Sequence, residues 1–247
     1  MNKTLEEKLK TEILNSSISE EEGIPILLNK KFVSGDNQKY MKMYNWMSKG
    51  YDIVEKVVGK FKYGNNIRET RKKLMNELEW KNSASVLYVS IGTGTDLKYI
   101  PPSVDLKTLD IVGVDLSIGM LKKCKENFKR EPLHLTFVNA CAEDLPFKEN
   151  SFDIVFHVGG INFFNDKSLA IAEMLRVAKK GTKIMIADET SDYIEEEFKK
   201  SFFAKKYFKD QSFSLDSLID SIPKDVKEKK VAYLWDNRFY CITFRKP

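Results

Sequence analysis

Two glycines and one aspartate have the residue types and the spacing to bind a ligand. Gly92 and Gly94 follow an apolar segment, residues 86–91, and Asp115 ends the next apolar segment, 23 residues after Gly92. Glycine has no Cβ, so a Gly-x-Gly turn after a strand lets the backbone approach a ligand closely. An acidic side chain near this distance from such a turn can accept hydrogen bonds from ribose hydroxyls.

The same turn excludes two classes of nucleotide site. Leu97 stands where a dinucleotide site has the third glycine of Gly-x-Gly-x-x-Gly, and no Gly-Lys-Ser/Thr loop is present. The predicted ligand therefore contains a ribose but no pyrophosphate, and S-adenosylmethionine meets that description. The alternative is a tight strand-to-helix turn that binds no ligand.

Strands and helices alternate around these residues. Apolar runs predict five strands separated by helices, followed by two strands joined by a four-residue connection that permits only an antiparallel hairpin. The predicted strands are 86–91, 110–114, 133–138, 152–158, 183–187, 230–234 and 239–244. This pattern predicts an α/β fold, a Rossmann-like doubly wound sheet of seven strands, mostly parallel with a C-terminal antiparallel hairpin.

The residues before the sheet read as an appendage. Helical periodicity predicts a short helix near the start, then helices over 40–58 and 66–78, and the segment 23–28 reads as a brief extended stretch. The proline in that stretch, Pro25, places it at an edge. We expect residues 1–80 to form an N-terminal helical extension and cap.

Composition excludes several classes of protein. The net charge is +5 and six of the 41 basic residues are arginine, which argues against a nucleic-acid partner. No apolar run is long enough to span a bilayer, so no stable membrane insertion is expected. Three widely spaced cysteines predict neither a disulfide framework nor a metal site, and they fit a reducing compartment. We expect a soluble, cytoplasmic protein.

Four further segments resemble the class I S-adenosylmethionine-dependent methyltransferases, and most closely the family of ubiquinone and menaquinone biosynthesis C-methyltransferases. They are Asp-Leu-Ser-x-x-Met-Leu at 115–121, Ala-Glu-Asp-Leu-Pro-Phe at 142–147, Ser-Phe-Asp-Ile-Val at 151–155 and Glu-Met-Leu-Arg-Val-Ala-Lys-Lys-Gly at 173–181. The resemblance covers about residues 51–183. It implies that residues 81–247 form a methyltransferase domain with S-adenosylmethionine as cofactor and a small-molecule methyl acceptor.

The resemblance also implies a set of cofactor-binding positions. Gly92 and Gly94 would pack against the methionine end, Asp115 would take both ribose hydroxyls, and Ala142 would meet the adenine edge. The remaining positions border the cofactor or close the pocket: Tyr51, Tyr88, Ser90, Leu116, Met120, Cys141, Glu143 and Val158.

Three of these positions depart from the family pattern. The family usually has an acid at Tyr88, glycine at Ser90 and commonly aspartate at Cys141. A charge-assisted hydrogen bond contributes about 1.5–3 kcal/mol, so the loss of two carboxylates would weaken cofactor binding. Asp96 is a candidate replacement for one of them. The departures leave a second hypothesis open, a methyltransferase-like protein with weak or no catalysis that acts through a partner.

Two residues are candidates for catalysis. His157 lies near the carboxyl end of the fourth predicted strand and could act as a general base if the acceptor must lose a proton. Asn162, in the loop that follows, could orient the acceptor. Each has a structural alternative, namely a strand histidine with one hydrogen bond and a loop asparagine that stabilises its own turn. Trp46 is either a second cap over the pocket or a core residue, and aromatic residues between 202 and 208 form a possible lid.

Overall fold

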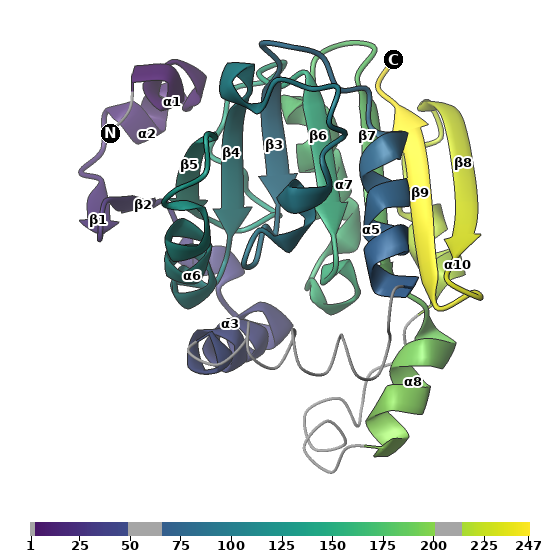
Figure 1. Cartoon of the computed structure of the whole chain (residues 1–247). Helices are drawn as coiled ribbons and strands as arrows, with labels where there is room; N and C mark the ends of the chain where they lie inside the picture. The colour runs from purple at the N-terminus through teal and green to yellow at the C-terminus, as the bar shows by residue number, and fades with distance from the viewer. Residues whose placement is uncertain (1–2, 49–65, 201–213) are drawn as a thin grey trace.

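The structure is a computed structural model, and it describes residues 3–48, 66–200 and 214–247. Within these ranges nine strands form one sheet in the order β1-β2-β5-β4-β3-β6-β7-β9-β8 (Figure 1). The strands are β1 Ser19–Glu21, β2 Ile24–Ile26, β3 Ser85–Val89, β4 Asp110–Asp115, β5 His134–Asn139, β6 Ile154–Val158, β7 Lys183–Glu189, β8 Lys227–Leu234 and β9 Phe239–Arg245.

The predicted fold is confirmed. Strands β3 to β7 run parallel to one another, β9 pairs antiparallel with β7, and β8 pairs antiparallel with β9. The predicted number of seven strands is wrong, because a hairpin of β1 and β2 extends the sheet beyond β5. Every residue of β1 is exposed, so β1 lacks the apolar run that marks a buried strand. Strand β2 lies within the extended stretch expected over 23–28, but its expected edge position is wrong, because β1 pairs with its outer side.

Helices precede, connect and cover the strands. The α-helices are α1 Lys3–Lys8, α2 Thr11–Leu14, α3 Gly35–Met47, α5 Asn66–Glu77, α6 Ile118–Phe128, α7 Lys167–Val177, α8 Ser191–Lys200 and α10 Leu215–Asp220. The 3-10 helices are η1 Lys30–Phe32, η3 Thr95–Tyr99, η4 Leu106–Thr108 and η5 Ile161–Phe163. No helix in the described ranges has the length and apolar character needed to cross a membrane.

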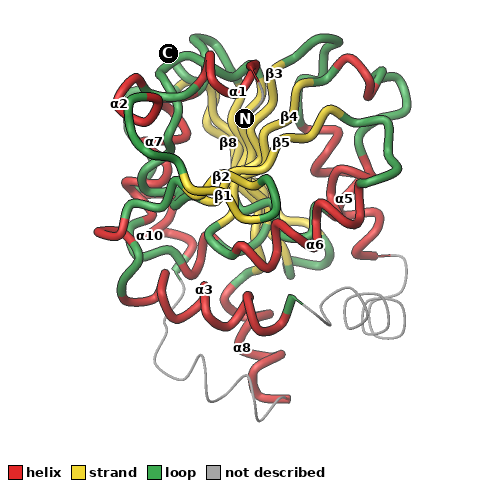
Figure 2. The backbone as a smooth tube through the Cα atoms, turned by 90° about the vertical axis from the view of Figure 1, so that its left-hand side faces the viewer, coloured by secondary structure: helices red, strands yellow, loops and turns green. Residues whose placement is uncertain are grey.

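The core has two layers, one on each face of the sheet. Figure 2 shows helices on both sides of the strands. Side chains of β3 alternate between them, with Val86 and Tyr88 in one layer and Leu87 and Val89 in the other. Helices α5 and α6 cover the layer of Tyr88, whereas α1, α7 and α10 cover the opposite layer. This alternation and the helices on both faces are what a doubly wound sheet requires.

The N-terminal segment is packed into the opposite layer. Leu5 and Leu9 are buried there, and the backbone of Leu9 forms a bridge with Phe147. Lys10 binds the Asp144 carboxylate at 3.1 Å. The segment therefore shares the core of the sheet.

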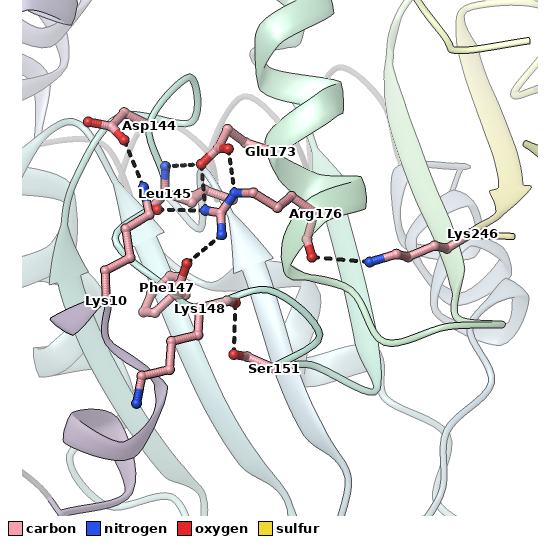
Figure 3. Close-up of polar contacts among 9 residues, drawn as sticks. All are labelled: Lys10, Asp144, Leu145, Phe147, Lys148, Ser151, Glu173, Arg176 and Lys246. Carbon is pink, nitrogen blue, oxygen red and sulfur yellow. Dashed lines mark hydrogen bonds and ion pairs between the residues drawn. The ribbon is translucent and has the colours of Figure 1, made fainter. Parts of the chain in front are cut away.

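An arginine on α7 fixes the loop onto which this segment docks (Figure 3). Arg176 donates to the carbonyl oxygens of Phe147 and Leu145 at 2.7 and 3.0 Å and pairs with Glu173. Glu173 in turn accepts the Leu145 N–H at 2.9 Å. Two of the segments that carry the family resemblance thus bind each other, and their contacts serve the fold.

Candidate active site

A cavity of about 280 Å³ opens where the parallel strands end. Ser90, Asp115, Val158 and Asp188 line it, and these residues end or follow β3, β4, β6 and β7. Helices α3 and α5 contribute four residues each to the wall. Open parallel sheets bind ligands at this edge, where the strand order reverses, and here the order reverses at β3.

The turn after β3 holds three residues in the left-handed region. The φ angles are 56° at Ser90, 57° at Gly92 and 77° at Gly94. A Cβ on Gly92 would meet no atom within 4 Å, so the backbone there faces open space. A Cβ on Gly94 would lie 2.6 Å from Cys124 Sγ and 2.7 Å from the Phe128 ring, so this glycine lets α6 pack against the turn.

Asp115 joins the turn to the end of β4. Its Oδ2 accepts the Gly92 N–H and its Oδ1 accepts the Ser117 N–H, each at 2.8 Å. Burial raises the pKa of Asp115 to about 6, although its backbone hydrogen bonds lower it. These two bonds fix the orientation of the carboxylate, and its position on the cavity wall lets it accept further donors such as ribose hydroxyls.

The next part of the wall is mainly apolar. Leu116, Met120 and Ala142 line the cavity beyond Asp115, together with the buried carboxylate of Glu143. Glu143 Oε1 accepts the Asn37 amide at 2.8 Å, which ties the start of α3 to this wall.

The far end of α3 is tied down at a second point. Asn45 Oδ1 accepts hydrogen bonds from Ser117 Oγ at 2.7 Å and from the Gly119 N–H at 3.0 Å. A Cβ on Gly119 would lie 2.6 Å from Ser48 Oγ, so the absence of a side chain permits this close approach. With both ends anchored, α3 is a fixed wall of the cavity.

On the β3 side of the turn, three polar side chains form a chain of hydrogen bonds. The Tyr88 hydroxyl donates to Asp96 Oδ2 at 2.6 Å, and Arg71 of α5 donates to Asp96 Oδ1 at 2.6 Å. Burial, followed by the charge of Asp96, raises the pKa of Tyr88 well above its ordinary value. Asp96 therefore places a carboxylate beside the Tyr88 hydroxyl on the cavity wall.

A second buried carboxylate lies at the end of β7. Asp188 Oδ2 accepts the N–H groups of Gly160 and Asn162 at 3.0 and 3.2 Å, and Oδ1 accepts that of Glu189 at 2.8 Å. Burial raises the pKa of Asp188 to about 6, against the opposing effect of these N–H groups. Asp188 thus holds the loop after β6 and carries a titratable group on the cavity wall.

The structure gathers nine of the predicted site residues around the cavity. They are Tyr88, Ser90, Gly92, Asp115, Leu116, Met120, Ala142, Glu143 and Val158. Four others do not line the cavity, namely Gly94, Cys141, His157 and Asn162. Tyr51 and the aromatic residues at 202–208 fall outside the described residues, and Trp46 is 71% exposed.

Three of the predicted site residues that do not line the cavity, His157, Asn162 and Cys141, are held by burial or by hydrogen bonds next to it. His157 is buried with Nδ1 at 3.0 Å from the Val89 carbonyl oxygen, and burial lowers the pKa of its imidazole to about 4. Asn162 donates to the Glu189 carbonyl oxygen at 3.0 Å and accepts from the Tyr240 hydroxyl at 3.3 Å. Burial, with the charge of Glu143, raises the pKa of the Cys141 thiol to about 12.

Arg71 and Asp188 are functional candidates that the sequence analysis missed. Asp188 follows an apolar strand as Asp115 does, and that shared signal could have identified it. Arg71 sits on a helix among other basic residues, and only the packing of α5 against η3 brings it to Asp96.

Known proteins match this chain in sequence. A family model described as a methyltransferase domain matches residues 87–186. The demethylmenaquinone methyltransferase of Renibacterium salmoninarum is 34% identical over 146 residues, which is 59% of this chain and 56% of that protein. The corresponding protein of Staphylococcus saprophyticus is 31% identical over 166 residues, 64% of this chain and 69% of that protein. The chain spans between about half and three fifths of the first three curated relatives.

Solved structures match the fold. Haemonchus contortus phosphoethanolamine N-methyltransferase 2, in a complex with S-adenosylhomocysteine, aligns with a TM-score of 0.66 and 16% identity over 87% of this chain and 61% of that one. A Thermotoga maritima protein described as an S-adenosylmethionine-dependent methyltransferase, possibly a histamine N-methyltransferase, aligns with a TM-score of 0.60 and 20% identity over 86% of this chain and all of that one. The sequence matches do not favour the alternative of a methyltransferase-like protein with weak or no catalysis that acts through a partner. The chain therefore belongs to the S-adenosylmethionine-dependent methyltransferases, in the family that contains the demethylmenaquinone methyltransferases.

Proposed function

We propose that this chain transfers a methyl group from S-adenosylmethionine to a small-molecule acceptor. The observation that carries the proposal is Asp115, a carboxylate fixed at the end of β4 by the Gly92 N–H and placed on the cavity wall. The residues around it fit the cofactor, because Gly92 leaves open space beside Asp115 and the wall beyond is mainly apolar.

Each part of the cofactor then has a partner in the wall. Asp115 would accept the ribose hydroxyls, Leu116 and Met120 would border the adenine, and Ala142 with Glu143 would meet its edge. The cofactor supplies an electrophilic methyl group on a sulfonium. The task of the chain is to hold the acceptor in line with that methyl group and to exclude water.

The opposite half of the cavity supports an apolar or aromatic acceptor. Tyr40 and Phe163 lie there with ring centroids 4.5 Å apart, and Phe164, Trp235 and Phe239 also line the wall. The relatives named demethylmenaquinone methyltransferases fit this preference. We therefore propose an aromatic ring compound, such as a quinol, as the acceptor class.

A proton must leave the acceptor when the attacked atom carries one. Asp188 is a candidate general base, since it is a buried carboxylate on this half of the wall. A base with a pKa near the working pH is effective in proton transfer, and the pKa of Asp188 is raised to about 6. The catalytic roles predicted for His157 and Asn162 stay proposals, and both residues would act from behind the wall.

We also propose that residues 1–80 form an extension of a methyltransferase domain formed by residues 81–247, with helices α3 and α5 as its cap. Helices α3 and α5 support this division, because they contribute Tyr40, Tyr44, Thr70 and Arg71 to the cavity wall. We propose a cytoplasmic location, which is supported by three buried cysteines that form no disulfide with one another.

The proposal is tested by isothermal titration calorimetry with S-adenosylhomocysteine. The wild-type chain should bind, and Asp115→Asn should weaken binding about tenfold or more, as the loss of a charge-assisted hydrogen bond implies. Asp110→Asn is the matched control, because Asp110 starts the same strand at the opposite edge of the sheet and should leave affinity unchanged. No detectable binding by the wild-type chain would contradict the proposal.

A second assay tests the acceptor class. Radiolabelled S-adenosylmethionine should transfer its methyl group to a short-chain demethylnaphthoquinol, and Asp188→Asn should reduce kcat with little effect on S-adenosylhomocysteine affinity. Transfer to amines but to none of the ring compounds would refute the acceptor assignment and leave the methyltransferase assignment intact.

A further inference from the structure

The hydrogen-bonded chain of Tyr88, Asp96 and Arg71 has no part in binding the ribose or the adenine. Asp96 is 3% exposed, yet it lines the cavity together with Tyr88 and Arg71. Tyr88 is fixed by stacking on Phe156 at a centroid distance of 4.2 Å. Its pairing with Arg71 and Tyr88 offsets the cost of burying a carboxylate, and the paired groups still line the cavity, where they can meet a ligand.

The order of residues along the cavity gives the direction of a bound nucleoside. Ala142 and Glu143 follow β5, Asp115 ends β4, and the turn with Asp96 follows β3, and these three strands are neighbours in the sheet. A nucleoside with its ribose on Asp115 and its base toward Ala142 therefore directs its 5′ substituent across the turn toward Asp96. In S-adenosylmethionine this substituent ends in an α-ammonium and an α-carboxylate group.

We propose that Asp96 and Arg71 together bind the amino-acid end of the cofactor, with Asp96 on the ammonium and Arg71 on the carboxylate. The inference rests on the proposed function. Among the described residues that line the cavity, Arg71 is the only lysine or arginine, so the charges of this pair are complementary to those of the ligand. The guanidinium fork suits a planar carboxylate.

Tyr88 acts as a positioning residue in this arrangement. Its hydroxyl stays protonated because burial and the charge of Asp96 raise the pKa of the phenol, and it therefore donates to Asp96 Oδ2. Where the family pattern has an acid on the strand itself, this chain places a tyrosine that holds a carboxylate eight residues further on.

The test compares two ligands that differ only at the amino-acid end. S-adenosylhomocysteine carries the ammonium and the carboxylate, whereas 5′-methylthioadenosine keeps the nucleoside and the sulfur but lacks both. Calorimetry on the full chain should show that Arg71→Met and Asp96→Asn each weaken S-adenosylhomocysteine binding about tenfold or more. Both variants should bind 5′-methylthioadenosine within about twofold of the wild type.

A third ligand separates the two roles. Decarboxylated S-adenosylmethionine keeps the ammonium and lacks the carboxylate, so Arg71→Met should leave its affinity nearly unchanged while Asp96→Asn should weaken it. Tyr88→Phe should weaken S-adenosylhomocysteine binding less than Asp96→Asn does, with 5′-methylthioadenosine unaffected. Lys72→Met is the matched control, since Lys72 lies beside Arg71 on α5 and its side chain, which is 42% exposed, pairs with Glu69.

The outcomes distinguish this inference from the proposed function. If the wild type binds neither S-adenosylhomocysteine nor 5′-methylthioadenosine, the proposed function fails. If the wild type binds both and the two variants weaken both equally, the pair is structural and the inference alone is refuted. If neither variant weakens S-adenosylhomocysteine binding, the inference is likewise refuted. Should Arg71→Met unfold, as circular dichroism would reveal, Arg71→Gln supplies the same comparison, because glutamine lacks the charge but can still donate a hydrogen bond to Asp96.

Discussion

Gly92 and Gly94 lie two residues apart in one turn, and alanine at each should have opposite consequences. Both φ angles are in the left-handed region, at 57° and 77°, which costs a residue with a Cβ about 1–2 kcal/mol. Part of this cost, about 0.4–1 kcal/mol, is offset because alanine reduces the entropy of the unfolded chain. Strain alone therefore predicts a loss of about 1 kcal/mol in the free energy of unfolding for either variant.

Packing separates the two positions. At Gly94 the new Cβ would lie 2.6 Å from Cys124 Sγ and 2.7 Å from Phe128 Cε2, and both side chains are buried on α6. Overpacking of this kind costs a further 1–3 kcal/mol or so. At Gly92 nothing lies within 4 Å, so the added methyl group costs no packing energy and instead occupies space in the cavity.

The two variants are compared in two assays. Urea unfolding should show that Gly94→Ala loses about 2–4 kcal/mol and Gly92→Ala about 1 kcal/mol. Calorimetry with S-adenosylhomocysteine should show a large loss of affinity for Gly92→Ala, although it is the more stable of the two. Adding Cys124→Ala to Gly94→Ala should restore part of the lost stability, because it removes the shorter contact.

Two results would refute this reasoning. Equal losses of stability would mean that α6 moves away from the turn without cost. Wild-type affinity in Gly92→Ala would mean that the cofactor does not approach this backbone.

Three further predictions concern pH and the fold. The pKa of Asp115 in the folded chain is raised to about 6, and ribose binding favours its ionised form. S-adenosylhomocysteine affinity should therefore fall about tenfold between pH 7.5 and pH 5, and Asp115→Asn should abolish this dependence. A wild-type affinity that does not change with pH would contradict the prediction. Leu9→Ala should cost about 2–5 kcal/mol in urea unfolding, whereas Leu14→Ala, at a 39% exposed residue, should cost much less; similar losses would argue that the segment is not docked. Arg176→Met should lower the free energy of unfolding by about 2–3 kcal/mol, because it removes the hydrogen bonds to two carbonyl oxygens. The exposed residue Arg130 provides the control variant, Arg130→Met. A loss below about 0.5 kcal/mol for Arg176→Met would refute the structural role of Arg176.

The strands of the sheet could be predicted where burial on both faces leaves a run of apolar residues. Val86 to Val89 supply both core layers in turn, and that is why the segment reads as a strand. Strand β1 has only exposed residues, Ser19–Glu21, so nothing in its composition distinguishes it from a loop. It pairs with β2 across the two-residue turn Glu22-Gly23, in which both φ angles are left-handed, at 52° and 73°.

The candidate site also has one part that the sequence predicts and another that it does not. Spacing alone placed Gly92 and Asp115 together, because parallel strands end at one edge of the sheet, and a hydrogen bond of 2.8 Å joins them. The pair of Arg71 and Asp96 depends on how α5 packs against η3, and the ties of Asn37 and Asn45 depend on how α3 crosses the cavity. Such contacts between distant segments are set by the assembled fold, so residue type and spacing along the chain did not reveal them.

The docked N-terminal segment has a consequence for the order in which the protein matures during synthesis. Leu5 and Leu9 leave the ribosome before Phe147, against which Leu9 forms its bridge and which is made 138 residues after Leu9. At typical elongation rates of about 5–20 residues per second, these apolar side chains have no native partner for roughly 7 to 30 s. The nascent chain should therefore expose Leu5 and Leu9 to chaperones until β5 and the loop that follows it have emerged.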